Sequence, residues 1–268
     1  MTNNQHKNLI DIGANLTNKR FHSDLEQTLV RAREAGLEHI LITGTSAQNS
    51  YDALTLSQRF PDLLSTTAGV HPHDAKSWST DTKFQIQELL NDEKVLAVGE
   101  CGLDFNRDFS PRPQQAECFR EQLEIACDIQ KPVFLHERDA HEAFVAILSE
   151  YRDQLSGAVV HCFTGNKNQL QCYLDMDCHI GITGWVCDER RGKSLQDIVK
   201  YIPADRLMIE TDAPYLTPRN MKSLAKGGRN EPAFLSSIVT TLAELRGVDE
   251  EQIAAQSTKV AKEFFKIP

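Results

Sequence analysis

Four side chains that commonly bind metal ions each lie at or just after a short apolar run in this sequence. Glu100 ends the run VLAVGE, His136 follows VFL, His161 follows AVV, and Asp212 comes shortly after LMI. Such runs are typical of buried strands, and the carboxyl ends of parallel strands meet at one rim of a barrel. Two imidazoles and two carboxylates suit borderline or hard divalent ions such as Mg, Mn or Zn, and the ligand set alone leaves the choice among them open. The pattern therefore predicts a metal-dependent hydrolase.

Each of these residues taken alone has a plainer interpretation. A single His after a strand is commonly a hydrogen-bonded core or surface residue, and a single Asp or Glu there often caps a helix or pairs with a cation. Four such groups at one rim are different, because without a cation their carboxylates would be partly buried and unpaired at high cost. Their joint occurrence favours a metal site.

The elements that must position these residues are eight apolar, β-rich runs alternating with segments of helical period. The predicted strands cover 9–12, 39–44, 65–70, 95–100, 132–136, 158–163, 179–184 and 206–211. The predicted helices cover 24–35, 46–59, 81–91, 113–130, 140–154, 167–176, 193–201, 231–246 and 249–265. This alternation, without a Gly-rich nucleotide loop, favours a (β/α)8 TIM barrel over a doubly wound sheet. We expect one domain over 1–268.

Composition limits the partners and the compartment. The formal net charge of −9 argues against broad electrostatic adhesion to nucleic acid, although a local basic rim can still hold a phosphodiester. The chain has seven cysteines, an odd number, with no C-x-x-C pair, which indicates a reducing compartment. No signal-like or membrane-spanning apolar stretch is seen. We expect a cytoplasmic monomer with no membrane partner.

Basic and aromatic residues follow several of the predicted strands, where they could hold nucleic acid. Arg229 is the strongest candidate for a phosphate contact, although it could instead anchor its loop by binding Glu231 or a backbone carbonyl. Trp185 and Phe163 could stack on a base or simply pack a neighbouring helix. The other residues placed on this rim are Asn15, His71, His73, Arg138, Arg190, Arg191, Arg219, Lys222 and Lys226.

Seven segments spread along the chain resemble the TatD family of metal-dependent deoxyribonucleases. They are GVHPH, GECGLDF, PVFLHERDA, VVHCFTG, GITGWVCDERRG, IETDAPYL and RNEP. The resemblance implies an amidohydrolase-like, metal-dependent TIM-barrel hydrolase that cleaves DNA phosphodiester bonds, usually with Mg as activator. It also implies that Glu100, His136 and His161 bind the ion and that Asp212 is the acidic residue of the catalytic centre.

One part of the family pattern is missing. Many members carry an H-x-H pair at the end of the first strand, where this chain has Gly13, Ala14 and Asn15. Losing two imidazoles removes two ligands, so we expect one firmly bound divalent ion rather than two.

The predicted function is a nuclease, a 3′ to 5′ exonuclease acting on single-stranded DNA ends; the polarity follows from the resemblance alone. RNA is an alternative substrate, and DNA repair or degradation is the implied role. Glu100 and Asp212 are the predicted catalytic residues, whereas His71, Arg138 and Arg229 are predicted to bind substrate. Two alternatives stay open: a metal-dependent amide, lactone or ester hydrolase on the same barrel, and a degenerate barrel that acts as a binding partner.

Overall fold

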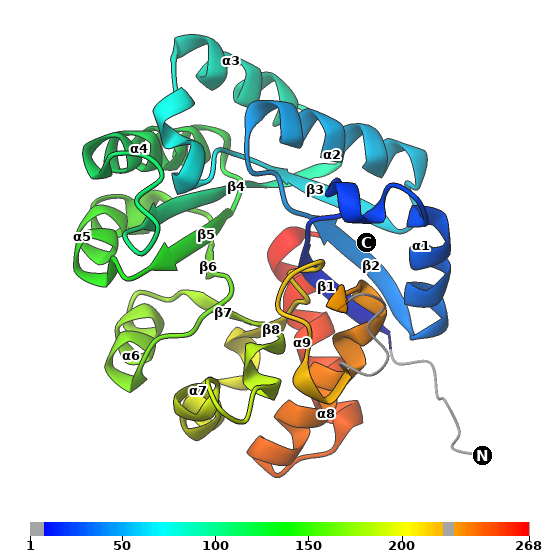
Figure 1. The fold of residues 1–268 in the computed structure, drawn as a ribbon. Helices are drawn as coiled ribbons and strands as arrows, with labels where there is room; N and C mark the ends of the chain where they lie inside the picture. The colour runs from blue at the N-terminus through cyan, green and yellow to red at the C-terminus, as the bar shows by residue number, and fades with distance from the viewer. Residues whose placement is uncertain (1–7, 222–227, 268) are drawn as a thin grey trace. The chain divides into compact units, whose positions relative to one another are not determined.

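A computed structural model describes residues 8–221 and 228–267. Its eight strands form one sheet in chain order, with helices between them (Figure 1). The strands are β1 Leu9–Ala14, β2 Leu37–Ile42, β3 Leu64–Ala68, β4 Val95–Asp104, β5 Val133–Arg138, β6 Ala158–Val160, β7 His179–Ile182 and β8 Leu207–Ile209. This is the strand order of a (β/α)8 barrel, which confirms the predicted fold class.

The helices fall close to the predicted ranges. They are α1 Leu25–Glu34, α2 Ala47–Arg59, α3 Thr80–Leu89, α4 Arg112–Ile129, α5 His141–Tyr151, α6 Lys167–Asp175, α7 Lys193–Ile198, α8 Leu235–Arg246 and α9 Glu250–Phe265. The largest difference between the predicted and observed strands is in β4, which runs four residues past the predicted end at Glu100. None of the described helices combines the length and the hydropathy needed to cross a bilayer.

The contacts of the described residues group into two compact units. The central unit comprises Ile42–His161 and Gln171–His179, and the terminal unit comprises the described residues of Met1–Leu41, Cys162–Leu170 and Ile180–Pro268. The single domain expected over 1–268 stays a prediction.

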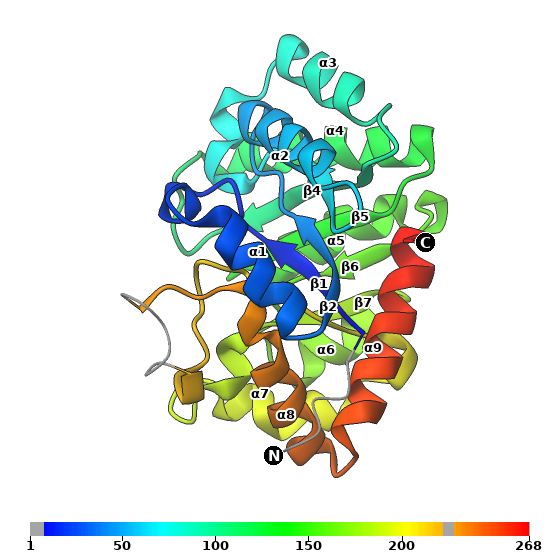
Figure 2. The same cartoon turned by 90° about the vertical axis from the view of Figure 1, so that its right-hand side faces the viewer.

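The central unit is built on parallel strands β3 to β6, most of whose residues are buried; His136, Glu137 and Arg138 at the end of β5 are partly exposed. Val98 of β4 pairs with Val133 of β5, which in turn pairs with Ala158 of β6. Helix α4 packs on β4 and on α5, and the rings of Phe119 and Phe144 stack with centroids 5.1 Å apart. Helices α2 and α3 lie side by side in both views (Figures 1 and 2). The packed helices fix the strands that carry most of the candidate ligands.

The terminal unit contains β1 and β8 as neighbours. Ala14 forms a parallel bridge with Ala213, and the backbone N–H of Asp212 donates to the carbonyl of Gly13 over 2.8 Å. Helix α9 packs on both strands and on α8, as Figure 2 shows for the two helices. Gly247 ends α8 with φ +66, a left-handed cap that glycine adopts without strain. The residues that follow β1 and β8 are thereby held next to each other.

Candidate metal centre

Strand β4 turns Glu100 out of the regular ladder. Gly99 pairs with Phe134 and Cys101 pairs with Leu135, so Glu100 is the extra residue of a β-bulge on this side. Its N–H donates instead to the carbonyl of Gly44 over 2.7 Å. Bulges of this kind re-aim a side chain next to functional sites. The bulge therefore gives the Glu100 carboxylate a direction that strict alternation along the strand would not give.

Three imidazoles contact one oxygen of this carboxylate. Glu100 Oε1 lies 2.7 Å from His161 Nε2, 2.9 Å from His136 Nδ1 and 3.3 Å from His71 Nε2. Glu100 is only 6% exposed, and its side-chain partners are largely buried too. The structure thus brings together three predicted residues, Glu100, His136 and His161, and adds His71 as a fourth member.

A second carboxylate, Asp104, extends the group. Its Oδ2 is 2.8 Å from His73 Nε2, while its Oδ1 accepts the backbone N–H groups of Asn106 and Arg107. His136 Nε2 is 3.4 Å from the same Oδ2 but is too poorly aligned for a hydrogen bond, so this buried nitrogen has no hydrogen-bond partner among the described residues. We call this group the imidazole–carboxylate cluster. It comprises two carboxylates and four histidines: Glu100, Asp104, His71, His73, His136 and His161.

Sequence reasoning placed His73 on the rim but missed Asp104. The segment GECGLDF contains it, yet a strand predicted to stop at Glu100 leaves Asp104 in a loop. In the structure the strand continues because Gly102 has φ +144 and any side chain there would collide with the carbonyl of His136. The second glycine of the segment was the available signal that β4 runs on beside β5.

The electrostatics of the cluster favour an ionised Glu100. Burial by itself raises the pKa of a carboxyl group, but the charges of His161 and His71 and hydrogen bonds from His136 and His161 outweigh it, so the pKa of Glu100 lies well below its usual value. Burial lowers the pKa of His136, but its contacts with Asp104 and Glu100 raise that pKa above its ordinary value. Burial dominates for His71, whose pKa is lowered. The cluster therefore holds an ionised carboxylate next to imidazoles, among which the lowered pKa of His71 favours its neutral form.

These donors fit a divalent cation. The ligand atoms of His71, Glu100 and His136 all lie within 4.8 Å of one another, and no thiolate is involved. Neutral imidazole and carboxylate are the ligands of borderline and hard divalent ions. The unsatisfied Nε2 of His136 is a further donor atom that a metal could use.

Asp212 lies in the terminal unit, so its convergence with Glu100 stays a prediction. It is held in the left-handed region at φ +53, and its Oδ1 accepts a hydrogen bond from Asn15 Nδ2 over 2.8 Å. Asn15 thus contacts the predicted acidic residue from the position where many family members have a histidine. An amide there can orient a carboxylate but supplies no ring nitrogen.

The predicted substrate-binding arginines differ in how they are held. Both terminal guanidinium nitrogens of Arg229 donate to Asp24, over 2.6 and 2.8 Å, and one also donates to the carbonyl of Arg20. Its side chain is 10% exposed and lies over the ring of Phe21. These contacts favour the alternative in which Arg229 anchors its loop; a phosphate contact stays a prediction. Arg138 ends β5 and is half-buried.

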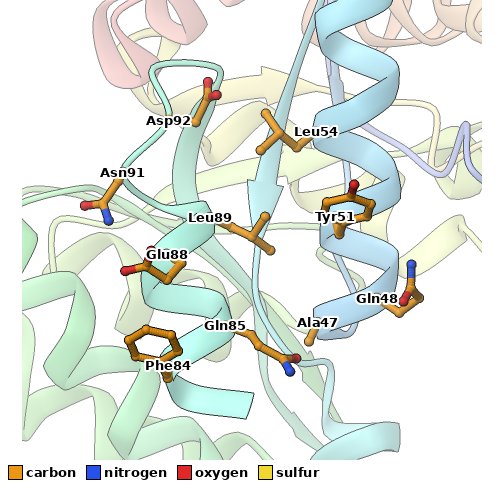
Figure 3. A pocket seen from close by; sticks show the side chains of 10 residues that line it. All are labelled: Ala47, Gln48, Tyr51, Leu54, Phe84, Gln85, Glu88, Leu89, Asn91 and Asp92. Atoms are coloured by element: carbon orange, nitrogen blue, oxygen red, sulfur yellow. The ribbon is translucent and has the colours of Figure 1, made fainter. Parts of the chain in front are cut away.

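Two other features add nothing to the candidate site. Lys222 and Lys226 lie outside the described residues. A cavity of about 780 Å³ opens between α2 and α3, but the residues that line it include none of the cluster (Figure 3). Leu54 and Leu89 point into it from the two helices, with Tyr51 beside them. Among the features of the central unit, the cluster rather than this cavity concentrates the chemistry.

The sequence of this chain is similar to those of known nucleases. The family described as TatD related DNase matches residues 10–266. A protein of Pectobacterium parmentieri named 3′-5′ ssDNA/RNA exonuclease TatD is 49% identical over 97% of this chain and 100% of its own length. A protein of the same name from Salmonella typhimurium is 47% identical, covering 97% of this chain and 99% of that one.

Solved structures agree on the fold. A TatD homologue from Escherichia coli is 30% identical with a TM-score of 0.88, covering 97% of this chain and 98% of that one. A phosphotriesterase homology protein from Escherichia coli, solved with phosphate in its active site, has a TM-score of 0.67 at 13% identity, covering 97% of this chain and 99% of that one. At that identity the second likeness concerns the barrel alone.

Proposed function

Because this chain belongs to the TatD-related DNase family, and is therefore a nuclease, we propose that it is a 3′ to 5′ exonuclease that removes nucleotides from single-stranded DNA ends and also acts on RNA. The observation that carries the proposal is the contact of three imidazoles with one oxygen of a buried carboxylate, a ligand set suited to the divalent ion that phosphodiester hydrolysis uses. Mg is the proposed ion, bound at one firm site.

In the proposed mechanism Glu100, His136 and His161 would hold the ion, and His71, whose Nε2 lies 3.3 Å from Glu100 Oε1, would supply a further nitrogen ligand. The bound ion supplies Lewis-acid polarisation of the scissile phosphate and a lower pKa for water. Asp104 fixes the ring of His73 and approaches that of His136, as carboxylates beside metal ligands commonly do.

Asp212 is the proposed group that orients or deprotonates the attacking water. Its carboxylate is oriented by Asn15, which donates a hydrogen bond to Oδ1. Arg138 is the proposed contact to a non-bridging phosphate oxygen, because its guanidinium charge opposes the charge that develops there. His71 was predicted to bind substrate. It would contact the substrate phosphate only if its ring nitrogen did not bind the ion.

We further propose a monomer in the cytoplasm. The seven cysteines, all in the described part of the chain, form no disulfide, which supports a reducing compartment.

The proposed activity is tested with single- and double-stranded DNA and RNA labelled at either the 5′ or the 3′ end, in Mg, Mn or chelator. We expect a ladder that shortens from the 3′ end of single strands, with no products in chelator. Equal cleavage in chelator would overturn the metal dependence. Shortening from the 5′ end would overturn the polarity.

A further inference from the structure

The segment GWVCDERRG, residues 184–192 of the terminal unit, presents a planar cation to solvent. The guanidinium carbon of Arg191 lies 4.6 Å above the ring of Trp185, within the range of a cation–π contact. The Arg191 side chain is nevertheless 62% exposed, and that of its neighbour Arg190 is 65% exposed. The indole thus supports the guanidinium without covering its outer side.

Asp188 fixes this arrangement from a second direction. Its Oδ1 accepts the backbone N–H groups of Arg190 and Arg191, over 3.0 and 3.1 Å, and its Oδ2 accepts Nε of Arg191 over 2.9 Å. Asp188 itself is only 2% exposed. A side chain at Gly192 would collide with the carbonyls of Trp185 and Asp188, so the segment needs glycine there. The guanidinium plane is therefore preorganised, whereas an ordinary surface arginine must lose rotamer freedom on binding.

The local charge is opposite to that of the whole protein. Arg219 joins this group, with Nε 2.9 Å from Glu189 and 3.9 Å from Asp188. Three arginines therefore outnumber the two carboxylates, on a chain whose formal net charge is −9. A local positive surplus attracts a phosphate backbone even when the total charge repels it.

We propose that Arg191, supported by Trp185, is a stacking platform for one base of a single-stranded substrate, and that Arg190 contacts an adjoining phosphate. Unstacked bases of single strands are commonly held on aromatic rings or on guanidinium planes, and such stacking tolerates every base. The inference rests on the proposed function, because it assumes that single-stranded nucleic acid is the substrate.

The test uses initial rates of the Mg-loaded enzyme on single-stranded oligonucleotides that carry one abasic site at successive positions from each end. Arg191→Lys keeps the charge but removes the planar group. We expect one position at which loss of the base lowers the kcat/KM of the wild-type enzyme by roughly fivefold or more. Arg191→Lys should show that loss already on the complete oligonucleotide, with no further loss at the abasic position.

Two further variants identify the source of the effect. Trp185→Leu should reproduce the pattern of Arg191→Lys, because the guanidinium loses its support. Arg190→Lys is the matched control, since it makes the same exchange on the neighbouring residue and should keep the wild-type dependence on the base. Far-UV circular dichroism and thermal melts establish that each variant is folded.

The proposal is overturned if Arg191→Lys keeps the wild-type base dependence, or if no position shows any dependence. Bis(p-nitrophenyl) phosphate, a phosphodiester without a nucleobase, separates this failure from failure of the nuclease proposal, because its hydrolysis by the wild-type enzyme shows that the phosphodiester chemistry is intact. A wild-type enzyme that leaves every oligonucleotide uncut would overturn the proposed substrate, whereas a cutting enzyme indifferent to Arg191→Lys would overturn only the platform.

Discussion

Two groups of side chains, one in each compact unit, surround buried or partly buried carboxylates with different kinds of nitrogen group. In the central unit, Glu100 and Asp104 are contacted by imidazoles. In the terminal unit, Asp24 and Glu231 are contacted by guanidinium groups: Arg229 binds Asp24, and Arg31 binds Glu231 over 2.6 and 2.9 Å. We call the second group the guanidinium–carboxylate network, which comprises these two acids and two arginines.

The difference lies in whether the cations are built into the chain. Arginine stays charged at every physiological pH, so the network neutralises its own carboxylates and requires nothing else. Imidazoles are neutral for much of that range and become ligands only by giving up a proton, so the cluster gains most from an added cation. The comparison predicts that the cluster governs activity and metal response, and that the network governs stability alone.

The largest effect is expected on activity when the cluster loses a ligand. Glu100→Gln and His161→Ala should each lower kcat of DNA hydrolysis by about 100-fold or more, because several kcal/mol of stabilisation by the metal is lost. Both variants should remain folded. His141→Ala is a matched control, since His141 binds the hydroxyl of Tyr173 and contacts no member of the cluster in the described structure. Near wild-type rates in both ligand variants would remove the cluster from the reaction.

The next effect is on stability, when the network loses a cation. Arg229→Ala leaves Asp24 without its bidentate partner and should lower the free energy of unfolding by about 2–4 kcal/mol, a range reduced for the partial exposure of Asp24. Denaturant unfolding measures the loss. In the folded fraction, kcat and the salt dependence of oligonucleotide binding should match wild type. A fall in kcat with unchanged stability would instead make Arg229 a phosphate contact.

The same contrast explains which parts of the fold and of the candidate site could be predicted from the sequence alone. Strand and helix positions follow from hydrophobic period, and the family resemblance identifies Glu100, His136 and His161, which the structure brings together. The role of His71 in the group was less visible, because its segment GVHPH follows β3 and its contact depends on the β4 bulge. Local patterns do not encode a bulge that shifts the register between two distant strands.

The partners of Arg229 were even harder to predict from the sequence. Its bidentate partner Asp24 is 205 positions away, just before α1, and nothing in either segment marks the pairing. Glu231 was considered as a partner because it is adjacent in sequence, and it does lie 3.5 Å from the guanidinium. Sequence reasoning found the near contact and missed the stronger distant one.

A third prediction sharpens the contrast through metal binding. At about 100 times its dissociation constant, Mg or Mn should raise the free energy of unfolding by about 2.7 kcal/mol, because it binds the folded state. Glu100→Gln should lose this increment, whereas Arg229→Ala should keep it. Calorimetric titration should show one tight site per chain, since Gly13 and Asn15 supply no imidazole. Two tight ions in the free protein would contradict the single site.

The smallest effect concerns another buried carboxylate, that of Asp11, which no imidazole or guanidinium of the described residues contacts. Asp11 in β1 accepts hydrogen bonds from the N–H of Gly13 and from the N–H and hydroxyl of Thr211. Burial raises the pKa of Asp11 to about 7, because these neutral donors only partly offset the desolvation of the charge. Asp11 has none of the nitrogen groups that contact the carboxylates of the cluster and the network in the described structure. We therefore predict that its carboxyl group is the neutral acid below that pH.

The pH dependence of stability tests this directly. The folded state binds the Asp11 proton more tightly than the unfolded chain does, so the stability from Asp11 is fully present below its unfolded pKa and is lost as pH rises toward 7. Asp11→Asn resembles the protonated form and should not show that loss. From pH 5 to 7, wild type should therefore lose up to about 2 kcal/mol relative to Asp11→Asn, and the difference should level off above that range. Urea unfolding of both proteins at each pH measures it. Parallel stability curves would mean that Asp11 is already ionised in the fold, and that hydrogen bonds from neutral donors can hold a buried carboxylate without any cation.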